Sequence, residues 1–272
     1  MIDVSKRQTH ILFSLCLFFF LTGCAKYRPA LLINYTKEGK EISIRKLVEG
    51  ASPSWSPDGG KIVFRRDGLL ILDLVTKEET RLAQAGTNPS WSPDGEKIAY
   101  VNNGIWVWNS KTDNHRQLIK SGNHPCWSPK GDSLIFDNNG IWRINIDGSG
   151  KIKLLDMGIP LSFSPDGSSL LVEVWEPDRV LFKLANLDIS TGTLEPITEG
   201  TKGSFAPDGY SIVYSSEGIW IYSIIKKVSM GIVLRGYDPK WSPDGDNIIF
   251  YARGSIWIVN APYKPIKQKK GI

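Results

Sequence analysis

The sequence has little cysteine and little histidine, and both shortages narrow the classes of function. Its 272 residues include three of each. Cys16 lies within an apolar N-terminal run, and Cys24 follows shortly after that run. The domain that follows therefore keeps only Cys126 and forms no internal disulfide. His115 and His124 fall in two links predicted to face opposite sides of the fold, which argues against a metal centre built from clustered histidines. The sequence also lacks a Gly-x-Ser-x-Gly stretch, the nucleophile elbow of α/β hydrolases.

The charge is only weakly unbalanced. Thirty-three Lys and Arg residues oppose 28 Asp and Glu residues, and the two signs are interleaved along the chain. A nucleic-acid-binding protein usually gathers its basic residues into one patch, so we expect no nucleic-acid partner. The single basic cluster runs from Lys264 to Lys270. We interpret residues 261–272 as a solvated C-terminal tail.

The N-terminus has the pattern of a bacterial lipoprotein signal. Lys6 and Arg7 precede an apolar run from Ile11 to Leu21, which is too short to span a membrane as a helix. The run ends in Leu-Thr-Gly-Cys, which resembles a lipobox, and a cleaved signal peptide without lipidation is the alternative. We therefore expect residues 1–23 to be removed and Cys24 to carry acyl chains that anchor the protein to a membrane. Ala25 after the cysteine, rather than aspartate, favours the outer membrane if the host has one.

A pentapeptide recurs six times and predicts the fold. Trp-Ser-Pro-Asp-Gly starts at Trp55, and complete or altered copies start at Trp91, Trp127, Phe163, Phe205 and Trp241. The spacings are 36, 36, 36, 42 and 36 residues, which is typical of a repeat architecture. Proline, aspartate and glycine suit successive positions of a hairpin turn, so we interpret the motif as a turn and its Asp residues as structural. Lys130 in the third copy shows that the position tolerates loss of the carboxylate.

Each repeat predicts one four-stranded antiparallel sheet. In the second copy we expect strands over 87–92, 97–101, 105–109 and 116–119, with Asn103-Gly104 forming the second turn. A tryptophan recurs on the third strand, at Trp106, Trp142, Trp220 and Trp257. Packing between adjacent sheets explains this recurrence better than a sugar-binding platform does. Cys126 occupies a position held by serine in four other copies and by lysine in the last, so we expect a small buried residue rather than a reactive thiol.

Counting strands predicts how the ring closes. A glycine stands five residues before every motif aromatic, after each outer strand, but the last motif has too few strands behind it to fill a sheet. We expect residues 41–48 to supply the missing outer strand and close a six-bladed β-propeller over residues 41–260. Residues 24–40 then form a short tether, in which Leu31 to Tyr35 are a candidate fifth strand. The fold class is all-β.

The repeated motif, together with Gly-Ile-Trp downstream of it, resembles the six-bladed propeller of TolB and its relatives over about residues 41–260. A similar repeat occurs in propellers of prolyl oligopeptidase relatives. The resemblance to TolB implies a periplasmic scaffold that docks envelope proteins, including a peptidoglycan-associated lipoprotein. We expect the chain to differ from TolB in two ways, by the lack of the α/β domain that precedes the propeller in TolB and by a lipid anchor of its own.

Candidate binding residues are those that the repeats do not share. They fall in loops expected on the face opposite the Pro-Asp-Gly turns, where sequence can vary without harm to the blades. The candidates are Arg65, Arg66, His124, Asp137, Glu176, Asp178, Arg179, Lys202, Tyr237, Asp238 and Arg253.

The function expected from these patterns is a monomeric, non-catalytic scaffold without a cofactor or metal, anchored in the bacterial cell envelope and binding an envelope protein or peptide. The alternative is a propeller enzyme or carbohydrate-binding protein that acts on envelope glycans. Several arginines together with Tyr237 make a sialidase-like site conceivable. A metal-dependent lyase is less well supported, because such lyases on similar propellers need a cluster of histidines that the sequence lacks.

Replacing Cys24 with serine tests the anchor. The Cys24→Ser protein should move from the membrane fraction to the soluble fraction and lose labelling by radioactive palmitate, because the thiol is the acyl acceptor. Unchanged labelling would refute lipidation at this residue.

Overall fold

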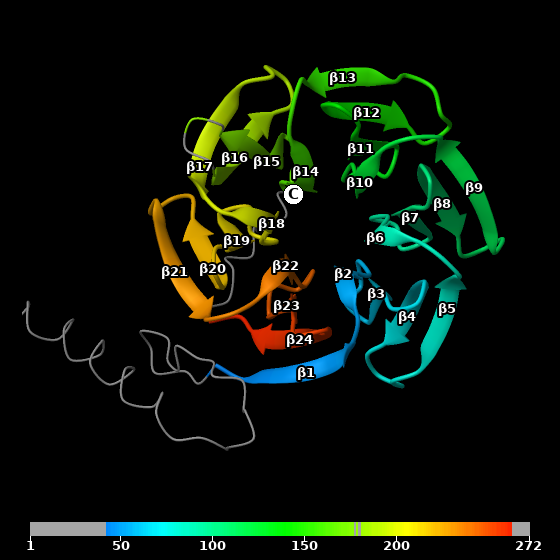
Figure 1. Ribbon diagram of the computed structural model, residues 1–272, viewed down its shortest axis with the longest axis horizontal. Coiled ribbons are helices and arrows are strands. Elements are labelled where there is room, and N and C mark those ends of the chain that lie inside the picture. The colour runs from blue at the N-terminus through cyan, green and yellow to red at the C-terminus, as the bar shows by residue number, and fades with distance from the viewer. Residues whose placement is uncertain (1–41, 177, 179–180, 263–272) are drawn as a thin grey trace, which may run out of the picture. The chain divides into compact units, whose positions relative to one another are not determined.

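Six four-stranded antiparallel sheets form a ring around a central channel (Figure 1). The computed structural model describes residues 42–262, except 177, 179 and 180. Within that part of the chain, no helix has the length and apolar composition needed to cross a membrane. The predicted tether and tail, including Cys24 and Leu31 to Tyr35, lie outside the described residues, apart from Ala261 and Pro262.

The first three blades follow one another in the chain, each running from an inner to an outer strand. Blade 1 contains β2 (Ala51–Trp55), β3 (Lys61–Arg65), β4 (Leu69–Asp73) and β5 (Glu79–Ala83). Blade 2 contains β6 (Thr87–Trp91), β7 (Lys97–Val101), β8 (Ile105–Asn109) and β9 (Asn114–Ile119). Blade 3 contains β10 (Asn123–Trp127), β11 (Ser133–Asp137), β12 (Ile141–Asn145) and β13 (Ile152–Leu155).

The other three blades complete the ring. Blade 4 contains β14 (Ile159–Phe163), β15 (Ser169–Glu176), β16 (Leu181–Asp188) and β17 (Leu194–Glu199). Blade 5 contains β18 (Thr201–Phe205), β19 (Ser211–Ser215), β20 (Ile219–Ser223) and β21 (Val228–Val233). Blade 6 contains β22 (Tyr237–Trp241), β23 (Asn247–Ala252), β24 (Ser255–Asn260) and the N-terminal β1 (Ile44–Glu49).

The N-terminal strand closes the ring as the sequence predicted. β1 pairs antiparallel with β24, with Ile44 opposite Val259 and Glu49 opposite Ser255. Gly50 then donates its N–H to the carbonyl of Gly254 at 3.0 Å before the chain enters blade 1. Figure 1 shows the first described strand lying beside the last one. Blade 6 therefore joins both ends of the domain, and its third strand is not left as an open edge.

The hydrophobic core is divided among the six junctions between neighbouring blades. The cluster between blades 2 and 3, for example, joins Ile105 and Val107 to Leu134 and Phe136. Similar clusters lie at the other five junctions, including the closing one between blades 6 and 1. Trp106 and Trp142 pack against these clusters, and their indole N–H groups donate to carbonyls of their own second turns. The predicted packing role of these tryptophans is confirmed.

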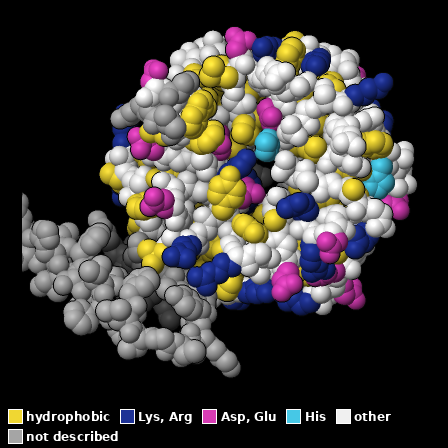
Figure 2. Space-filling model, in the orientation of Figure 1, with side chains coloured by type: hydrophobic (Ala, Val, Ile, Leu, Met, Phe, Trp, Pro, Cys, Tyr) yellow, Lys and Arg dark blue, Asp and Glu magenta, His cyan; other side chains and the backbone are white. Residues whose placement is uncertain are grey.

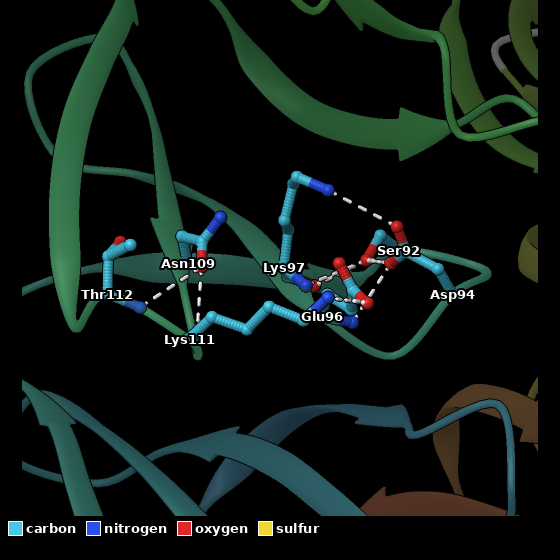
Figure 3. Close-up of polar contacts among 7 residues, drawn as sticks. All are labelled: Ser92, Asp94, Glu96, Lys97, Asn109, Lys111 and Thr112. Carbon is cyan, nitrogen blue, oxygen red and sulfur yellow. Dashed lines mark hydrogen bonds and ion pairs between the residues drawn. The ribbon is translucent and has the colours of Figure 1, made fainter.

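The motif residues make the turn that their chemistry predicts (Figure 3). In blade 2 the Ser92 hydroxyl accepts the N–H of Lys97 at 2.8 Å and donates to Asp94, which accepts the N–H of Glu96 at 2.9 Å. In blade 3, where Lys130 replaces the aspartate, Asp132 accepts the hydroxyl hydrogen bond of Ser128 instead, at 2.7 Å. A nearby carboxylate thus compensates for the lost one.

Hydrogen bonds within the turns also stabilise the charged carboxylates. The Ser56 hydroxyl lowers the pKa of Asp58, and the Ser164 hydroxyl lowers that of Asp166. These carboxylates are hydrogen-bonded acceptors within turns, so the structural interpretation of the motif is confirmed.

The recurring glycine before each inner strand has a packing reason that the sequence did not predict. In five blades an aromatic ring on the second strand lies against it. A Cβ built on Gly122, for example, would lie 2.7 Å from Cδ2 of Phe136, and Gly122 has φ +123°. The aromatic residues are Phe64, Tyr100, Phe136, Tyr214 and Phe250, and each is at most 4% exposed. Neither the space nor the backbone conformation tolerates a side chain.

Replacing Gly122 with alanine should lower the free energy of unfolding by about 2–5 kcal/mol, from left-handed backbone strain of about 1–2 kcal/mol and overpacking of about 1–3 kcal/mol. Gly192 is the matched control, because its φ is +72° but no atom lies within 4 Å of the added methyl group. Gly192→Ala should cost only about 1 kcal/mol. Urea denaturation of both variants checks the difference, and equal losses would contradict the packing role.

Candidate functional site

The site lies in the channel. A cavity of about 750 Å³ is lined by residues of all six inner strands, with additional contributions from Arg65 and Tyr251. Each inner strand begins on the face that carries the second turns and ends at its Pro-Asp-Gly turn. Figure 2 shows charged and histidine side chains gathered around a hollow at the centre of the ring. The mouth is the end of the cavity on the face that carries the second turns.

One position in the inner strand is occupied by a different residue in every blade. It stands three residues before the motif aromatic, and its side chains line the cavity. These residues form the mouth ring: Ser52, Asn88, His124, Pro160, Lys202 and Asp238. All except Pro160 have a left-handed backbone, with φ between 41° and 53°. The strands also change register here, as expected for a β-bulge that redirects a side chain.

His124 is the centre of a hydrogen-bonded chain across the mouth. Its Nδ1 lies 2.7 Å from a carboxylate oxygen of Asp137, at the end of β11, and its Nε2 lies 3.3 Å from the ammonium of Lys202 in blade 5. A carboxylate only accepts and an ammonium only donates, so this geometry fits the neutral tautomer with its proton on Nδ1. Both ring nitrogens are therefore used within the protein.

Buried and paired groups hold the rest of the mouth in place. Glu173, 5% exposed, accepts the backbone N–H of Lys202 at 2.9 Å. Asp238 forms an ion pair with Lys240 at 3.2 Å, and its N–H donates to Ser215 Oγ at 3.2 Å. The contacts of Glu173 and Ser215 fix the mouth ring from neighbouring blades, whereas the pair of Asp238 and Lys240 lies within β22.

Tyr237 adds an aromatic surface to the cavity wall. Its side chain is 45% exposed at the start of β22. Burial of the hydroxyl, together with the nearby carboxylates of Glu173 and Asp238, raises the pKa of Tyr237. The phenol therefore stays protonated at neutral pH and remains a hydrogen-bond donor.

The structure brings six of the sequence candidates together at the mouth. Arg65, His124, Lys202, Tyr237 and Asp238 line the cavity, and Asp137 contacts His124. His124 lies inside β10 rather than in the preceding link, where the sequence analysis placed it.

Other candidates point elsewhere or lie outside the described residues. Arg66 pairs with Glu79 of the outer strand β5. Arg253 is exposed in the turn between β23 and β24, with φ 51°. Glu176 pairs with Lys183 of its own blade at 2.7 Å, and Asp178 is exposed. Arg179 is not among the described residues.

Sequence reasoning missed Ser52, Asn88, Glu173, Lys240 and Tyr251. Ser52, Asn88 and Lys240 line the cavity from inner strands, whereas Glu173 and Tyr251 lie on second strands. Aligning the repeats on the motif aromatic and reading the third residue before it would have found Ser52 and Asn88. Glu173 and Tyr251 lie on second strands, where sheet register decides which residues reach the mouth, and no repeated motif in the sequence marks those positions.

The long interval of 42 residues produces a longer hairpin in blade 4. β15 and β16 each have eight residues, whereas the second and third strands of blades 1, 2, 3 and 5 have five. Trp175 and Phe182 pair on this extension, with ring centroids 4.7 Å apart, and each is 41% exposed. The longer repeat therefore extends the sheet and exposes an aromatic pair.

His115 lies away from His124, in the outer strand β9, where its Nδ1 is 2.9 Å from the hydroxyl of Tyr100. Across the described residues, no three His, Cys, Asp or Glu side chains are grouped so that they could hold a metal ion.

Comparisons with known proteins agree with this architecture. A family model described as the TolB beta propeller domain matches residues 52–231, more than half of the chain. The chain belongs to this family. No curated protein sequence matches this TolB-family chain.

Two solved structures show the same fold for this TolB-family propeller. TolB from Acinetobacter baumannii aligns with a TM-score of 0.61 and 17% identity, covering 82% of this chain and 64% of that one. The chain thus spans about two thirds of the length of that TolB. A putative TolB from Agrobacterium tumefaciens aligns with a TM-score of 0.60 and 19% identity, covering 78% of this chain and 98% of that one.

An enzyme also shares the fold of this TolB-family chain. A gluconolactonase from Xanthomonas campestris aligns with a TM-score of 0.68 and 11% identity, covering 88% of this chain and 98% of that one. Identities this low establish a shared fold, and function depends on the individual site.

The thiol of Cys126 should be unreactive. Burial raises its pKa from 9.0 to about 11, so the thiolate fraction at pH 8 falls about 100-fold. In protein with Cys16 and Cys24 replaced by serine, Ellman's reagent should react about 100-fold more slowly with the folded than with the urea-unfolded chain. Equal reaction rates would show that the thiol is accessible.

The raised pKa of Cys126 also predicts that this residue's contribution to stability is complete below pH 9 and is lost as the pH rises towards 11.

Proposed function

We propose that this protein is a lipid-anchored, non-catalytic scaffold of the bacterial cell envelope that binds a protein or peptide partner at the mouth of its channel. The observation that carries the proposal is the mouth ring. Six equivalent backbone positions carry six different residues there, whereas the motif around them is largely repeated. Variation at one position of a shared scaffold is expected where a ligand is recognised.

The arrangement of polar groups supports binding rather than catalysis. A nucleophile needs an adjacent free base, but both nitrogens of His124 already have partners. The hydroxyls of Ser54, Ser162 and Ser204, which line the cavity, each accept a backbone N–H of the next blade. The raised pKa of Cys126 keeps its thiol protonated at neutral pH. These groups fit structural roles in the channel wall.

Membership of the TolB propeller family supports a role in protein binding. The lipobox-like Leu-Thr-Gly-Cys supports a location on the periplasmic side of a membrane, which in a Gram-negative host is the outer membrane. A tether of residues 24–40 would keep the propeller near that membrane.

Carbohydrate binding is the second candidate function. The exposed pair Trp175 and Phe182 favours it, because flat aromatic surfaces stack against sugar rings and the pair lies on the hairpin that distinguishes blade 4. Binding of soluble envelope glycans that depends on Trp175 would support this alternative.

Reversible crosslinking in native envelopes, followed by capture of the protein, tests the scaffold function. Wild-type protein should recover a partner, and Tyr237→Ala should reduce recovery about tenfold or more, because exposed aromatic residues at the centre of an interface carry much of the binding energy. Tyr210→Ala is the matched control, because Tyr210 is 38% exposed and lies beside the Pro-Asp-Gly turn of blade 5, on the opposite face. Recovery of no partner, or equal losses in both variants, would contradict the proposal.

A further inference from the structure

The carboxylates at the mouth are already used inside the protein. Asp137 accepts a hydrogen bond from His124, and Glu173 accepts the backbone N–H of Lys202. Asp238 is paired with Lys240 at 3.2 Å. The acidic side chains therefore organise the mouth. Lys240 is paired with one of them, and Lys202 and Arg65 are the other positive residues that line the cavity.

Lys202 is held so that its ammonium enters the cavity. Its backbone is anchored by Glu173 and has φ 41°, and its Nζ reaches His124, two blades away. The residue between them in the mouth ring is Pro160, whose short ring has no hydrogen-bond donor. An ammonium has three donors, and the imidazole Nε2 accepts one of them. Two donors are left for a ligand, and an anchored side chain loses little entropy on binding.

Arg65, at the end of β3, lines the same cavity from blade 1. Its guanidinium carries several N–H donors in a planar fork, a geometry that suits planar oxyanions. Deeper in the channel, the hydroxyls of Ser54, Ser162 and Ser204 each accept a backbone N–H. Apolar surface comes from Pro129, Pro165, Pro207 and Pro243. The cavity thus combines positive donors at the mouth with a mainly uncharged wall below.

We propose that the mouth is a carboxylate-binding site, in which Lys202 and Arg65 bind the C-terminal carboxylate or an acidic side chain of a peptide. A carboxylate matches this donor set because it accepts several hydrogen bonds, and bonds between charged partners are the stronger ones. The cavity of about 750 Å³ is large enough to admit several residues behind the charged group. The identification of the ligand as a peptide rests on the proposed scaffold function, whereas carboxylate binding itself does not.

Two pairs of small probes test the site on the full chain. N-acetylglutamate amide and its glutamine analogue differ only in a side-chain carboxylate or carboxamide of nearly the same shape. Acetyl-diglycine with a free or an amidated C-terminus separates the two sources of carboxylate. We expect at least one acid to shift the ring signals of His124 in NMR spectra saturably, with a dissociation constant in the millimolar range, and its neutral analogue to bind at least tenfold more weakly.

Lys202→Asn removes the ammonium with little risk to the fold, because asparagine tolerates the left-handed backbone and Asn88 holds the same position in blade 2. It should abolish the saturable shift. Lys227→Asn is the matched control, since Lys227 also has a left-handed φ of 54° but lies in the turn between β20 and β21, at the opposite face of the same blade. Circular dichroism and thermal unfolding confirm that both variants are folded.

Each outcome decides the assignment. Equal binding of the acid and neutral probes, or undiminished binding by Lys202→Asn, overturns the carboxylate site. Tighter binding of inorganic phosphate than of either acid also overturns it, in favour of a general anion site. If the probes fail but the crosslinked partner is still captured through Tyr237, the scaffold function stands without this site. If the probes bind but no partner is captured, the carboxylate site stands without the scaffold function.

Discussion

The architecture depends on the pairing of the first described strand with the last. Each blade buries apolar side chains only against its two neighbours, so six junctions are complete only when the chain closes on itself. The pairing of β1 with β24 supplies the fourth strand of blade 6. That blade packs on blade 5 through Ile219 and Phe250, and on blade 1 through Ile62 and Ile256. Closure also surrounds the channel on all sides, and the mouth ring depends on it.

Most of the fold could be predicted because its determinants are local and repeated. In blade 2, residues 97–101 and 105–109 form strands as predicted, and the outer strand begins two residues earlier than expected, at Asn114. Turn chemistry in Pro-Asp-Gly and Asn-Gly explains this success. The contact between Gly122 and Phe136 was missed, because two residues fourteen positions apart meet only after the sheet has formed. The recurrence of this glycine could be seen in the sequence, but the reason for its recurrence can be seen only in the packed structure.

The site could be predicted only in part, for a related physical reason. Departure from the repeat identified His124, Lys202 and Asp238, but it also selected Arg66 and Arg253, which do not line the cavity. Sequence variation does not say which way a side chain points. That direction is set by the bulge at the start of each inner strand, where left-handed residues direct their side chains into the channel. The chain from Asp137 through His124 to Lys202 joins blades 3 and 5, and no local pattern contains it.

The closing strand also has a consequence for how the protein acquires its structure. Ile44 pairs with Val259, so the strand that leaves the ribosome first waits for nearly the whole domain to be synthesised. Contacts over such sequence distances form slowly, and an unpaired strand edge exposed meanwhile favours aggregation. For the exported protein proposed above, that delay has a use. A propeller that cannot close early remains unfolded longer, and an unfolded chain is the form that a narrow translocation pore accepts.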